Sequence, residues 1–544
     1  MPTREPVALW ASTSLGVVAL QVSVPAVPTG SVAVLVPALG YESSTSHRTL
    51  RALAEGLAEA GHLAVRVDLP GTGDAGGETG RATPEQLAAA LAEVLAALRA
   101  AGAERLSLVG LRAGAAIAEL AAGREPVDAL VLWAAAAGRR YRRELSLIGT
   151  PVPDGVGLPE GSVVVGGWTF PAPMLEGLAA LDLAALAPAG VAHALVLDRD
   201  DVHPQDALAD ALRATGADVE HRATPGHDRF LDRPSEDAEV GVEAVDAILA
   251  WFARAEPAVP ADPGVEPPGE PVARIPWAGG EVVEEAVALG EHRLAAVLTH
   301  GPARSRDVLL LLDSGSDPRH GPGRAWVEFA RELALRGQDV VRVDFRGWGE
   351  SPHLDAASGR PYDEHHGEDA REAAAALRRA GYERVVLSGL CAGAWVSLDV
   401  ARREPTDAVL ALNAQLYWQR GDPIEALMST TRERRRDEIA DIRRRCAAGE
   451  WDRADEAGQR PPAGVWLDEL AERRVPVSLV FAEGDDGVEY LRDRLGRRTA
   501  LLEARGSLRV REVPGVDHSM TRVWLRPQVL DVLAEELAGL LARD

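Results

Sequence analysis

The amino-acid sequence predicts an α/β protein with two domains in tandem, each a mostly parallel sheet flanked by helices, and a helical cap on the second. Three observations support this prediction. Short apolar runs alternate with helical stretches, the same series occurs twice, and a segment crowded with proline and glycine separates the two copies. A chain of 544 residues is also long enough for two domains of ordinary size.

The first copy begins with an apolar run over residues 32–40, which ends in glycine and is typical of a buried parallel strand. A helical stretch over 49–61, a second strand over 63–71 and a long helix over 84–102 follow. A third strand then enters the turn GLRAG at 110–114, and another helix continues from it.

The second copy repeats this series. Strand-like runs DVLLLLDSG, DVVRVDFRGWGES and RVVLSGL alternate with the helical runs AWVEFARELALRG and EDAREAAAALRRAG, and the last strand enters the turn GLCAG at 389–393. The two turns lie about half a chain apart, which is consistent with duplication or fusion of whole domains. We expect a first domain over residues 1–254, a linker over 255–276 and a second domain over 277–544.

The composition is that of an ordinary globular protein, with 46% hydrophobic and 26% charged residues. A formal net charge of −25 disfavours nucleic acid as a partner, because an acidic surface repels phosphate. All 58 basic residues are arginine, which excludes a Schiff-base lysine and a phosphate-loop lysine. We expect no membrane span and no signal peptide, and two cysteines without a disulfide framework favour a cytoplasmic location.

The turn at 389–393 carries the chemistry expected of the second domain. Glycines on both sides of Cys391 permit a sharp strand-to-helix turn that presents the middle side chain in a strained conformation. The N–H of Ala392 and the positive end of the next helix should point to the same place. We predict that Cys391 is a nucleophile, with a small buried core residue as the alternative. Cys446 is expected to be an incidental helix residue.

A histidine and an acid follow this cysteine along the chain. His518 lies in a loop between a short strand and the final helix, and Asp485 and Asp486 follow the apolar strand VPVSLVF. We expect Asp485, with Asp486 as the alternative, to orient the imidazole of His518. The imidazole would exchange a proton with Cys391.

Both halves resemble α/β-hydrolases. In the second half, nucleophile, acid and histidine occur in the order of that superfamily, and DFRGWGES at 344–351 is similar to one of its turns. There is also a narrower resemblance. PALGYESSTSHRTL, DLPGTGD and GLRAGA in the first half resemble one of two hydrolase-like families associated with exosortase A gene clusters, and the GLC turn of the second half resembles the other. The resemblance implies hydrolase chemistry in the second half.

An oxyanion formed at Cys391 would need two hydrogen-bond donors. The N–H of Ala392 is expected to be one of them. The other is expected from the backbone of Ser314 or Gly315, in the loop after the first strong strand of the second half, and the choice between them stays open.

Three further residues are candidates for the substrate pocket. Trp348 and Trp395 flank the turns that face it and could shape an apolar acyl site, with core packing as the alternative. His320 lies near the expected oxyanion loop, either in the pocket or in a surface turn. The run DEHH at 363–366 is not expected to bind metal, because adjacent histidines on a helix point in different directions. We expect no metal or other cofactor.

The corresponding turn of the first half carries Arg112, which stays protonated and cannot attack a carbonyl. We therefore expect this domain to be inactive, although His227 and Asp200 or Asp201 lie about where a histidine and an acid would fall. Arg112 would either bind a carboxylate or phosphate as an anion site, or pair with Asp200, Asp201 or another acid.

Both halves are expected to carry insertions. Residues 415–474 of the second half include an arginine-rich helical stretch, at a place where α/β-hydrolases often insert a cap. Its arginines could attract an acidic substrate or a carrier protein, or be balanced by neighbouring acids on a solvated helix. In the first half, VVVGGWTFPAPMLEGLAALDL is expected to form part of a smaller, more β-like insertion.

The leading functional prediction is hydrolysis of a carboxylic ester or thioester through a Cys391–His518–Asp485 triad and an acyl-thioester intermediate. The substrate would be a small acyl compound, alone or carried on an acyl-carrier protein or coenzyme A. The alternatives are an acyltransferase, cyclising enzyme or lyase of natural-product or envelope metabolism, and a binding or scaffold protein without catalysis.

Overall fold

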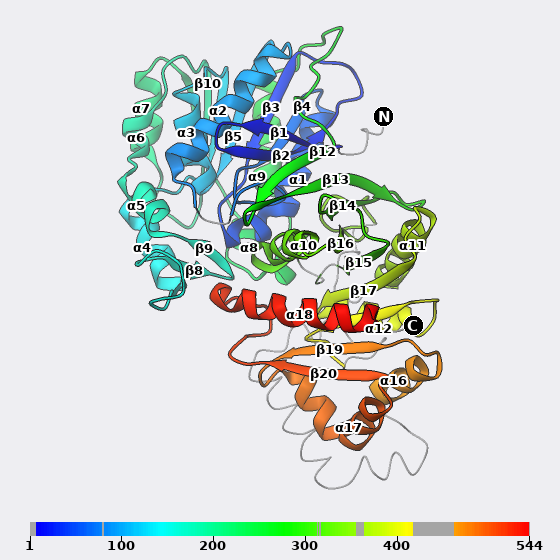
Figure 1. The fold of residues 1–544 in the computed structure, drawn as a ribbon. Helices are drawn as coiled ribbons and strands as arrows, with labels where there is room; N and C mark the ends of the chain where they lie inside the picture. The colour runs from blue at the N-terminus through cyan, green and yellow to red at the C-terminus, as the bar shows by residue number, and fades with distance from the viewer. Residues whose placement is uncertain are drawn as a thin grey trace. The chain divides into compact units, whose positions relative to one another are not determined.

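The computed structural model describes residues 7–78, 81–312, 314, 317–354, 364–416 and 462–542. The chain divides into two compact units, Met1–Ala286 and Val287–Asp544. Most of the cap expected over 415–474, including Cys446, lies outside the described residues. A large α/β sheet runs through each half of the chain (Figure 1).

The main sheet of the first half is mixed but mostly parallel. Its strands are β1 (Val7–Thr13), β2 (Gly16–Ser23), β3 (Ser31–Val36), β4 (Leu63–Asp68), β5 (Arg105–Leu111), β6 (Ala129–Trp133), β10 (His193–Arg199) and β11 (Asp218–Thr224). In the described part of this half they form one eight-stranded sheet, in the order β1-β2-β4-β3-β5-β6-β10-β11. β2 is antiparallel to β1 and β4, and all other neighbours are parallel.

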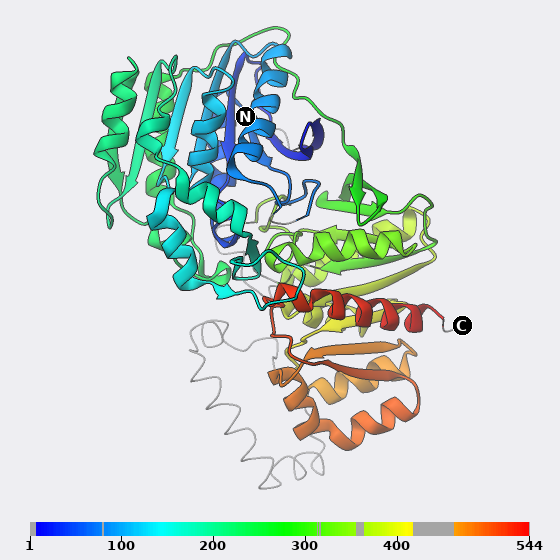
Figure 2. The same cartoon turned by 60° about the vertical axis from the view of Figure 1, so that its left-hand side comes forward.

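Helices cover both faces of this sheet (Figure 2). They are α1 (Tyr41–Glu59), α2 (Pro84–Ala100), α3 (Ala113–Ala122), α7 (Asp206–Ala214), α8 (Asp228–Leu231) and α9 (Val242–Ala255). Successive residues of β3 enter different cores, because side chains alternate along a strand. Val34 packs with apolar residues of α2 and α3, whereas Leu35 packs with those of α1 and α9. Burial on both faces explains why this strand is apolar throughout.

The β-like insertion expected in the first half is confirmed. Three short antiparallel strands form a separate sheet in the order β7-β8-β9 within the described residues. Its elements and the neighbouring helices are α4 (Gly138–Ile148), β7 (Thr150–Pro151), β8 (Val163–Val165), β9 (Trp168–Phe170), α5 (Ala172–Ala180) and α6 (Leu183–Leu186). The segment therefore adds a small layer beside the main sheet.

The sheet of the second half is also mixed and mostly parallel. Its strands are β12 (Val272–Trp277), β13 (Gly280–Leu289), β14 (Leu294–His300), β15 (Asp307–Leu312), β16 (Asp339–Val343), β17 (Arg384–Leu390), β18 (Ala408–Leu412), β19 (Val477–Ala482) and β20 (Leu508–Val513). Nine strands of the described residues follow the order β12-β13-β14-β16-β15-β17-β18-β19-β20. The five neighbouring pairs from β16 to β20 are all parallel.

Helices again cover the second sheet. They are α10 (Ala325–Leu335), α11 (Glu364–Arg379), α12 (Ala392–Ala401), α16 (Pro462–Glu472), α17 (Asp486–Ala504) and α18 (Arg526–Leu541), with short 3-10 turns η2 (Pro322–Arg324) and η3 (Val523–Leu525). Leu310 of β15 packs with residues of α11 and α12, and Leu311 packs with residues of α10 and α18. The central strands are thus enclosed from both sides, as in the first half.

The two sheets share one topology. The seven strands from β2 to β11 and the seven from β14 to β20 have the same order, including the exchange of the second and third strands in the sheet. This agreement supports the repeat seen in the sequence and confirms the predicted fold class. Residues 272–276, expected at the end of a linker, instead lie in strand β12.

None of the helices in the described part of the chain is both long and apolar enough to cross a membrane.

Candidate active site

The turn between β17 and α12 holds Cys391 in a strained conformation. Its φ of 55° and ψ of −109° lie in a region that L-residues rarely adopt. The turn is tight, since a Cβ on Gly389 would lie 2.5 Å from the carbonyl carbon of Gly393. The N–H of Cys391 donates to the Leu412 carbonyl at 3.0 Å. The partly exposed thiol therefore stands at the carboxyl end of β17, as the glycine spacing predicted.

The structure brings His518 and Asp485 together. Nδ1 of His518 donates to Oδ2 of Asp485 at 2.6 Å. The carboxylate is 4% exposed, caps the start of α17 and also accepts from the Gly487 N–H at 2.9 Å. Of the two acids that the sequence offered, Asp485 is thus the partner of the imidazole, whereas Asp486 is the first residue of the helix.

The His518 ring interacts with Cys391 as well as with Asp485. Burial alone would lower the pKa of the imidazole, but the neighbouring Cys391 side chain and the Asp485 carboxylate raise that pKa well above its ordinary value. Nε2 is buried and has no nitrogen or oxygen partner among the described residues. The imidazole is therefore bonded to Asp485 through Nδ1 and interacts electrostatically with Cys391. Its side chain is 35% exposed.

Asn413 was not predicted as part of this site. It follows β18 with a φ of 46° and is 4% exposed. Its Nδ2 donates to the His518 carbonyl at 2.6 Å, and its Oδ1 accepts from the Ala482 N–H at 2.7 Å. One amide therefore connects the histidine loop to the strand that leads to Asp485. The only sequence signal was an asparagine directly after a buried strand.

The loop after β15 lies at the same edge of the sheet as Cys391. In the parallel register Leu312 is opposite Gly389, so Ser314 and Cys391 each lie two residues beyond a paired position. The Ser314 hydroxyl is buried and has no hydrogen-bond partner in the described part of the chain. Gly315 lies outside the described residues.

A buried ion pair fixes the end of this loop. Arg319 is 2% exposed, and its guanidinium donates to Asp344 at 2.5 Å. The same carboxylate accepts from the N–H groups of Arg319, at 2.6 Å, and Glu350, at 2.9 Å. Gly349 must be glycine, because a Cβ there would lie 2.1 Å from the Asp344 carboxyl group. The turn DFRGWGES thus anchors the loop that carries Ser314.

The other pocket candidates occupy different surroundings. Trp348 and Trp395 are 2% and 1% exposed, and Trp395 packs edge-to-face on Trp466 with ring centroids 5.0 Å apart. Both belong to one hydrophobic core, so their placement favours the core-packing alternative. His320 lies in the turn before η2, where its carbonyl accepts from the Trp326 N–H at 3.0 Å.

The two adjacent histidines of the DEHH run point to different surroundings. His366 is 1% exposed and stacks on Phe345 with ring centroids 4.5 Å apart. His365 is 42% exposed and lies 3.4 Å from Glu368. Helical geometry separates the two rings, as expected for neighbouring positions.

Arg112 occupies the first-half turn with nearly the backbone angles of Cys391, φ 54° and ψ −122°. Its Nε donates to Glu42 at 2.6 Å and its Nη2 to Glu144 at 2.8 Å, while Tyr141 donates to Glu42 at 3.0 Å. Burial would lower the pKa of Arg112, but Glu42, Tyr141 and Glu144 raise it above its usual value. Of the two alternatives that the sequence offered for Arg112, the structure shows pairing with acids. The partners are Glu42 and Glu144, and two carboxylates already balance the charge that an anion site would need.

Among the residues that the structure describes, His227 of the first half has no hydrogen-bonded carboxylate of the kind that His518 has. Its Nε2 accepts from the Trp133 indole at 2.9 Å, and its Nδ1 donates to the Thr224 carbonyl at 3.0 Å. Burial is the main reason that the pKa of this imidazole is lowered. Asp201 pairs instead with Arg199 at 2.7 Å. Both ring nitrogens of His227 are therefore occupied, and the inactivity of this half stays a prediction.

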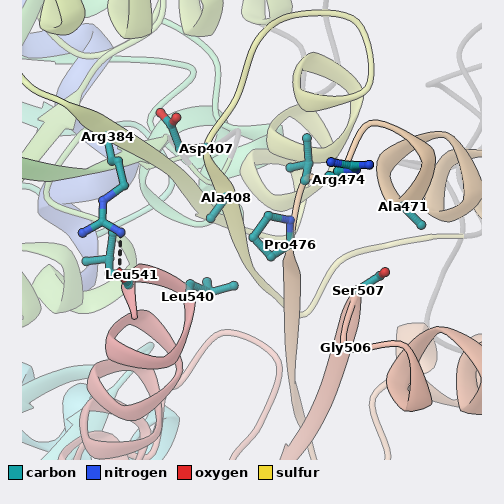
Figure 3. Close-up of a pocket in the computed structure, with 11 residues that line it drawn as sticks. Arg384, Asp407, Ala408, Ala471, Arg474, Pro476, Gly506, Ser507, Leu540 and Leu541 are labelled. Carbon is teal, nitrogen blue, oxygen red and sulfur yellow. Dashed lines mark hydrogen bonds between the residues drawn. The ribbon is translucent and has the colours of Figure 1, made fainter. Parts of the chain in front are cut away.

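A cavity of about 430 Å³ lies at the opposite edge of the second sheet. Figure 3 shows it among the amino ends of β17 to β20 and the end of α18. Arg384 in its wall donates to the Leu541 carbonyl and pairs with Asp307 at 2.7 Å. Because Cys391 follows the carboxyl end of β17, this cavity is separate from the candidate active site.

The sheet order and the strained turn define the second half as an α/β-hydrolase fold. Residues 296–530 match the Alpha/beta hydrolase family, and this range contains Cys391, Asp485 and His518. No curated protein sequence matches the chain significantly.

Several solved structures are similar to about half of the chain. Est1E from Butyrivibrio proteoclasticus, with ferulic acid bound, is 16% identical, covers 46% of this chain and 99% of its own, and has a TM-score of 0.35. A dienelactone hydrolase from Anabaena variabilis is 15% identical over 50% of this chain and 99% of its own, with a TM-score of 0.31. XC6422 from Xanthomonas campestris, an α/β serine hydrolase without a lid, is 16% identical over 48% of this chain and 96% of its own, with a TM-score of 0.31.

Proposed function

We propose that the second half hydrolyses a carboxylic ester or thioester, with Cys391 as the nucleophile. The observation that carries this proposal is the position of the His518 ring, bonded to Asp485 at 2.6 Å and interacting with the strained Cys391 thiol. This order of nucleophile, base and acid is the arrangement that nucleophilic catalysis requires.

The reaction would proceed in two stages. The imidazole of His518 accepts the thiol proton, and the sulfur of Cys391 forms a bond to the carbonyl carbon. As the tetrahedral intermediate collapses, the bond to the leaving alkoxide or thiolate breaks and the imidazolium donates the proton to it. A water molecule then gives a proton to His518, attacks the acyl-thioester and releases the acid and the free thiol. Asp485 orients the ring in both stages.

The oxyanion of each intermediate would form near the amino end of α12. The N–H of Ala392, the first residue of that helix, is the first donor that we propose. The second is supplied by the Ser314 loop, where the unpartnered hydroxyl adds a candidate to the backbone N–H predicted from the sequence. The Arg319–Asp344 ion pair supports this role, because it holds the end of the loop in place.

Acylation of the protein by p-nitrophenyl esters and acyl-thioesters of several chain lengths tests the nucleophile. Rapid-quench intact-mass analysis should show one added acyl group, lost in Cys391→Ala and retained in Cys446→Ser, the matched control. Acylation that persists in Cys391→Ala would contradict the proposal. Absence of acylation and of turnover, with Cys391 also unreactive towards iodoacetamide, would favour the binding or scaffold alternative.

The fate of the acyl group distinguishes hydrolysis from transfer. We expect the free acid as the main product when an amine or alcohol acceptor is added to the same assay. An acylated acceptor as the main product would replace hydrolase with acyltransferase. The narrower resemblance to the exosortase-associated families stays a prediction, as does delivery of the substrate on a carrier protein or coenzyme A.

A further inference from the structure

Helix α4 presents a strongly basic outer face. Its buried side chains are Tyr141 and Leu145, which lie four residues apart and therefore on one side of the helix. Four arginines occupy the exposed positions between and before them: Arg139, Arg140, Arg142 and Arg143. At about 100° per residue, Arg139, Arg140 and Arg143 fall on the side opposite the buried pair, and Arg142 falls on the flank of the helix.

These arginines are not neutralised within the described part of the chain. None of the four forms an ion pair with another described residue. The one acid of the helix, Glu144, is already bound to Arg112 at 2.8 Å. The chain as a whole has a net charge of −25, so this face is a local positive region on an acidic protein.

Two exposed aliphatic side chains complete the same helix. Leu147 is 75% exposed and Ile148 is 64% exposed, the two largest exposed fractions among the large hydrophobic residues of the described chain. Leu147 falls at the helical angle of the arginines, four residues after Arg143. Ile148 follows Leu145 by three residues and so lies on the other side, where it is exposed at the end of the helix. Isolated exposed apolar residues are ordinary, but an adjacent aliphatic pair beside four unpaired arginines indicates a contact surface.

We propose that α4 docks on an anionic lipid surface, lying in the plane of the interface. The arginines would bind lipid phosphates while Leu147 enters the boundary between headgroups and acyl chains, and the exposed Ile148 at the end of the helix contacts the same boundary. The complementary charge is necessary because the rest of the chain is repelled by an anionic membrane. This inference is independent of the catalytic proposal, since α4 belongs to the half that carries Arg112.

Lipid fits this face better than an acidic protein does. Binding energy at protein interfaces concentrates on aromatic residues and arginines that fill pockets. The exposed positions of α4 carry no aromatic residue, because its one tyrosine is buried. Aliphatic side chains flanked by arginines are the composition of helices that lie on membranes.

Vesicle flotation with the full chain tests the proposal. We expect binding to vesicles of phosphatidylglycerol and phosphatidylcholine at low salt, weaker binding as salt rises, and none to phosphatidylcholine alone. Each arginine near an anionic surface strengthens binding by about fivefold, so R139Q/R143Q should bind roughly 25-fold more weakly. L147S/I148S should also lose at least about tenfold in affinity.

A charge-matched variant, R124Q/R213Q, controls for net charge. It removes two exposed arginines from elsewhere in the same unit and should bind like the unmodified protein. Equal unfolding midpoints of all variants would exclude misfolding as the cause. Three results would overturn the proposal: no vesicle binding, equal loss in the control, or an unchanged affinity of R139Q/R143Q. Arginine-dependent retention on immobilised polyglutamate without vesicle binding would also overturn it, in favour of an acidic protein partner.

Discussion

The side chain of Asn413 is bonded to the main chain of His518, donating from Nδ2 to its carbonyl at 2.6 Å. Its Oδ1 accepts from the Ala482 N–H at 2.7 Å. A single amide therefore holds the His518 loop at a fixed distance from β19, the strand that leads to Asp485. Displacing a catalytic group by about 1 Å can cost roughly 10²-fold in rate. Asn413 is therefore a positioning residue for the proposed reaction.

Asn413→Asp removes one of these two hydrogen bonds and keeps the other. The carboxylate can still accept from Ala482 but can no longer donate to the His518 carbonyl. We expect kcat for an ester substrate to fall about 10- to 100-fold, with KM and the labelling of Cys391 by iodoacetamide nearly unchanged. Asn413→Gly is the companion variant, because glycine tolerates the φ of 46°. Full kcat in both variants would remove Asn413 from the mechanism.

Asp485→Asn should change the pH profile as well as the rate. The carboxylate is one of the groups that raise the pKa of His518, so its loss lowers that pKa. The acid limb of kcat/KM should move to lower pH, and kcat should fall roughly 10²- to 10⁴-fold as the ring loses its orientation. Initial rates over a pH series provide the measurement. A limb that moves to higher pH would show that another group controls the profile.

Arg112 and its partners Glu42, Glu144 and Tyr141 predict coupled effects on the stability of the first half. Arg112→Gln leaves the Glu42 carboxylate, whose side chain is 15% exposed, without its main cation. Loss of one partner of a buried ion pair typically costs about 3 kcal/mol or more. We expect the double variant Glu42→Gln/Arg112→Gln to lose less stability than Arg112→Gln alone. Hydrogen exchange of the β5 amides measures this stability. Strictly additive effects would contradict this coupling.

Glu119 predicts a pH dependence of the same unit. The side chain is 1% exposed, both carboxyl oxygens lack partners among the described residues, and burial, with a contribution from Asp182, raises its pKa to about 8. Between its ordinary value of 4.5 and about 8, the folded state binds more protons than the unfolded state, so stability falls as pH rises. The loss at pH 9 is on the order of a few kcal/mol.

Glu119→Gln removes this titration. We expect the variant to become increasingly more stable than the unmodified protein from pH 5 to pH 9, as measured by thermal unfolding of the first unit. Parallel stability curves for the two proteins over this range would show that Glu119 does not carry the effect.

Local signals were sufficient to predict the turn at Cys391 and the partners downstream of it. Glycines at fixed spacing define a strand-to-helix turn, and the apolar runs place its end at a sheet edge. Because parallel strands bring their carboxyl ends to one edge, the residues after β19 and β20 were predicted to approach Cys391. The choice between Asp485 and Asp486 needed coordinates, because one-residue differences at a helix start depend on the cap geometry.

Contacts between distant residues could not be predicted in the same way. Glu42 meets Arg112 across 70 residues, and the acids nearest in the expected order, Asp200 and Asp201, are not its partners. Asn413 acts through a main-chain carbonyl, which leaves no mark on residue type at the other end. The tryptophans near the turns pack in the core because a large apolar surface gains most from burial there.

The turn at Arg112 keeps its left-handed backbone although its side chain cannot perform the expected chemistry. A Cβ on Gly110 would lie 2.4 Å from Ala115, and one on Gly114 would lie 2.2 Å from the Pro37 carbonyl oxygen, so close backbone approach maintains this shape. The geometry of this turn therefore depends on the glycines and the neighbouring backbone, and not on the side chain at position 112. A different side chain could therefore be placed at position 112 without refolding of the turn, but a nucleophile there would still meet a His227 ring whose Nε2 is bonded to Trp133.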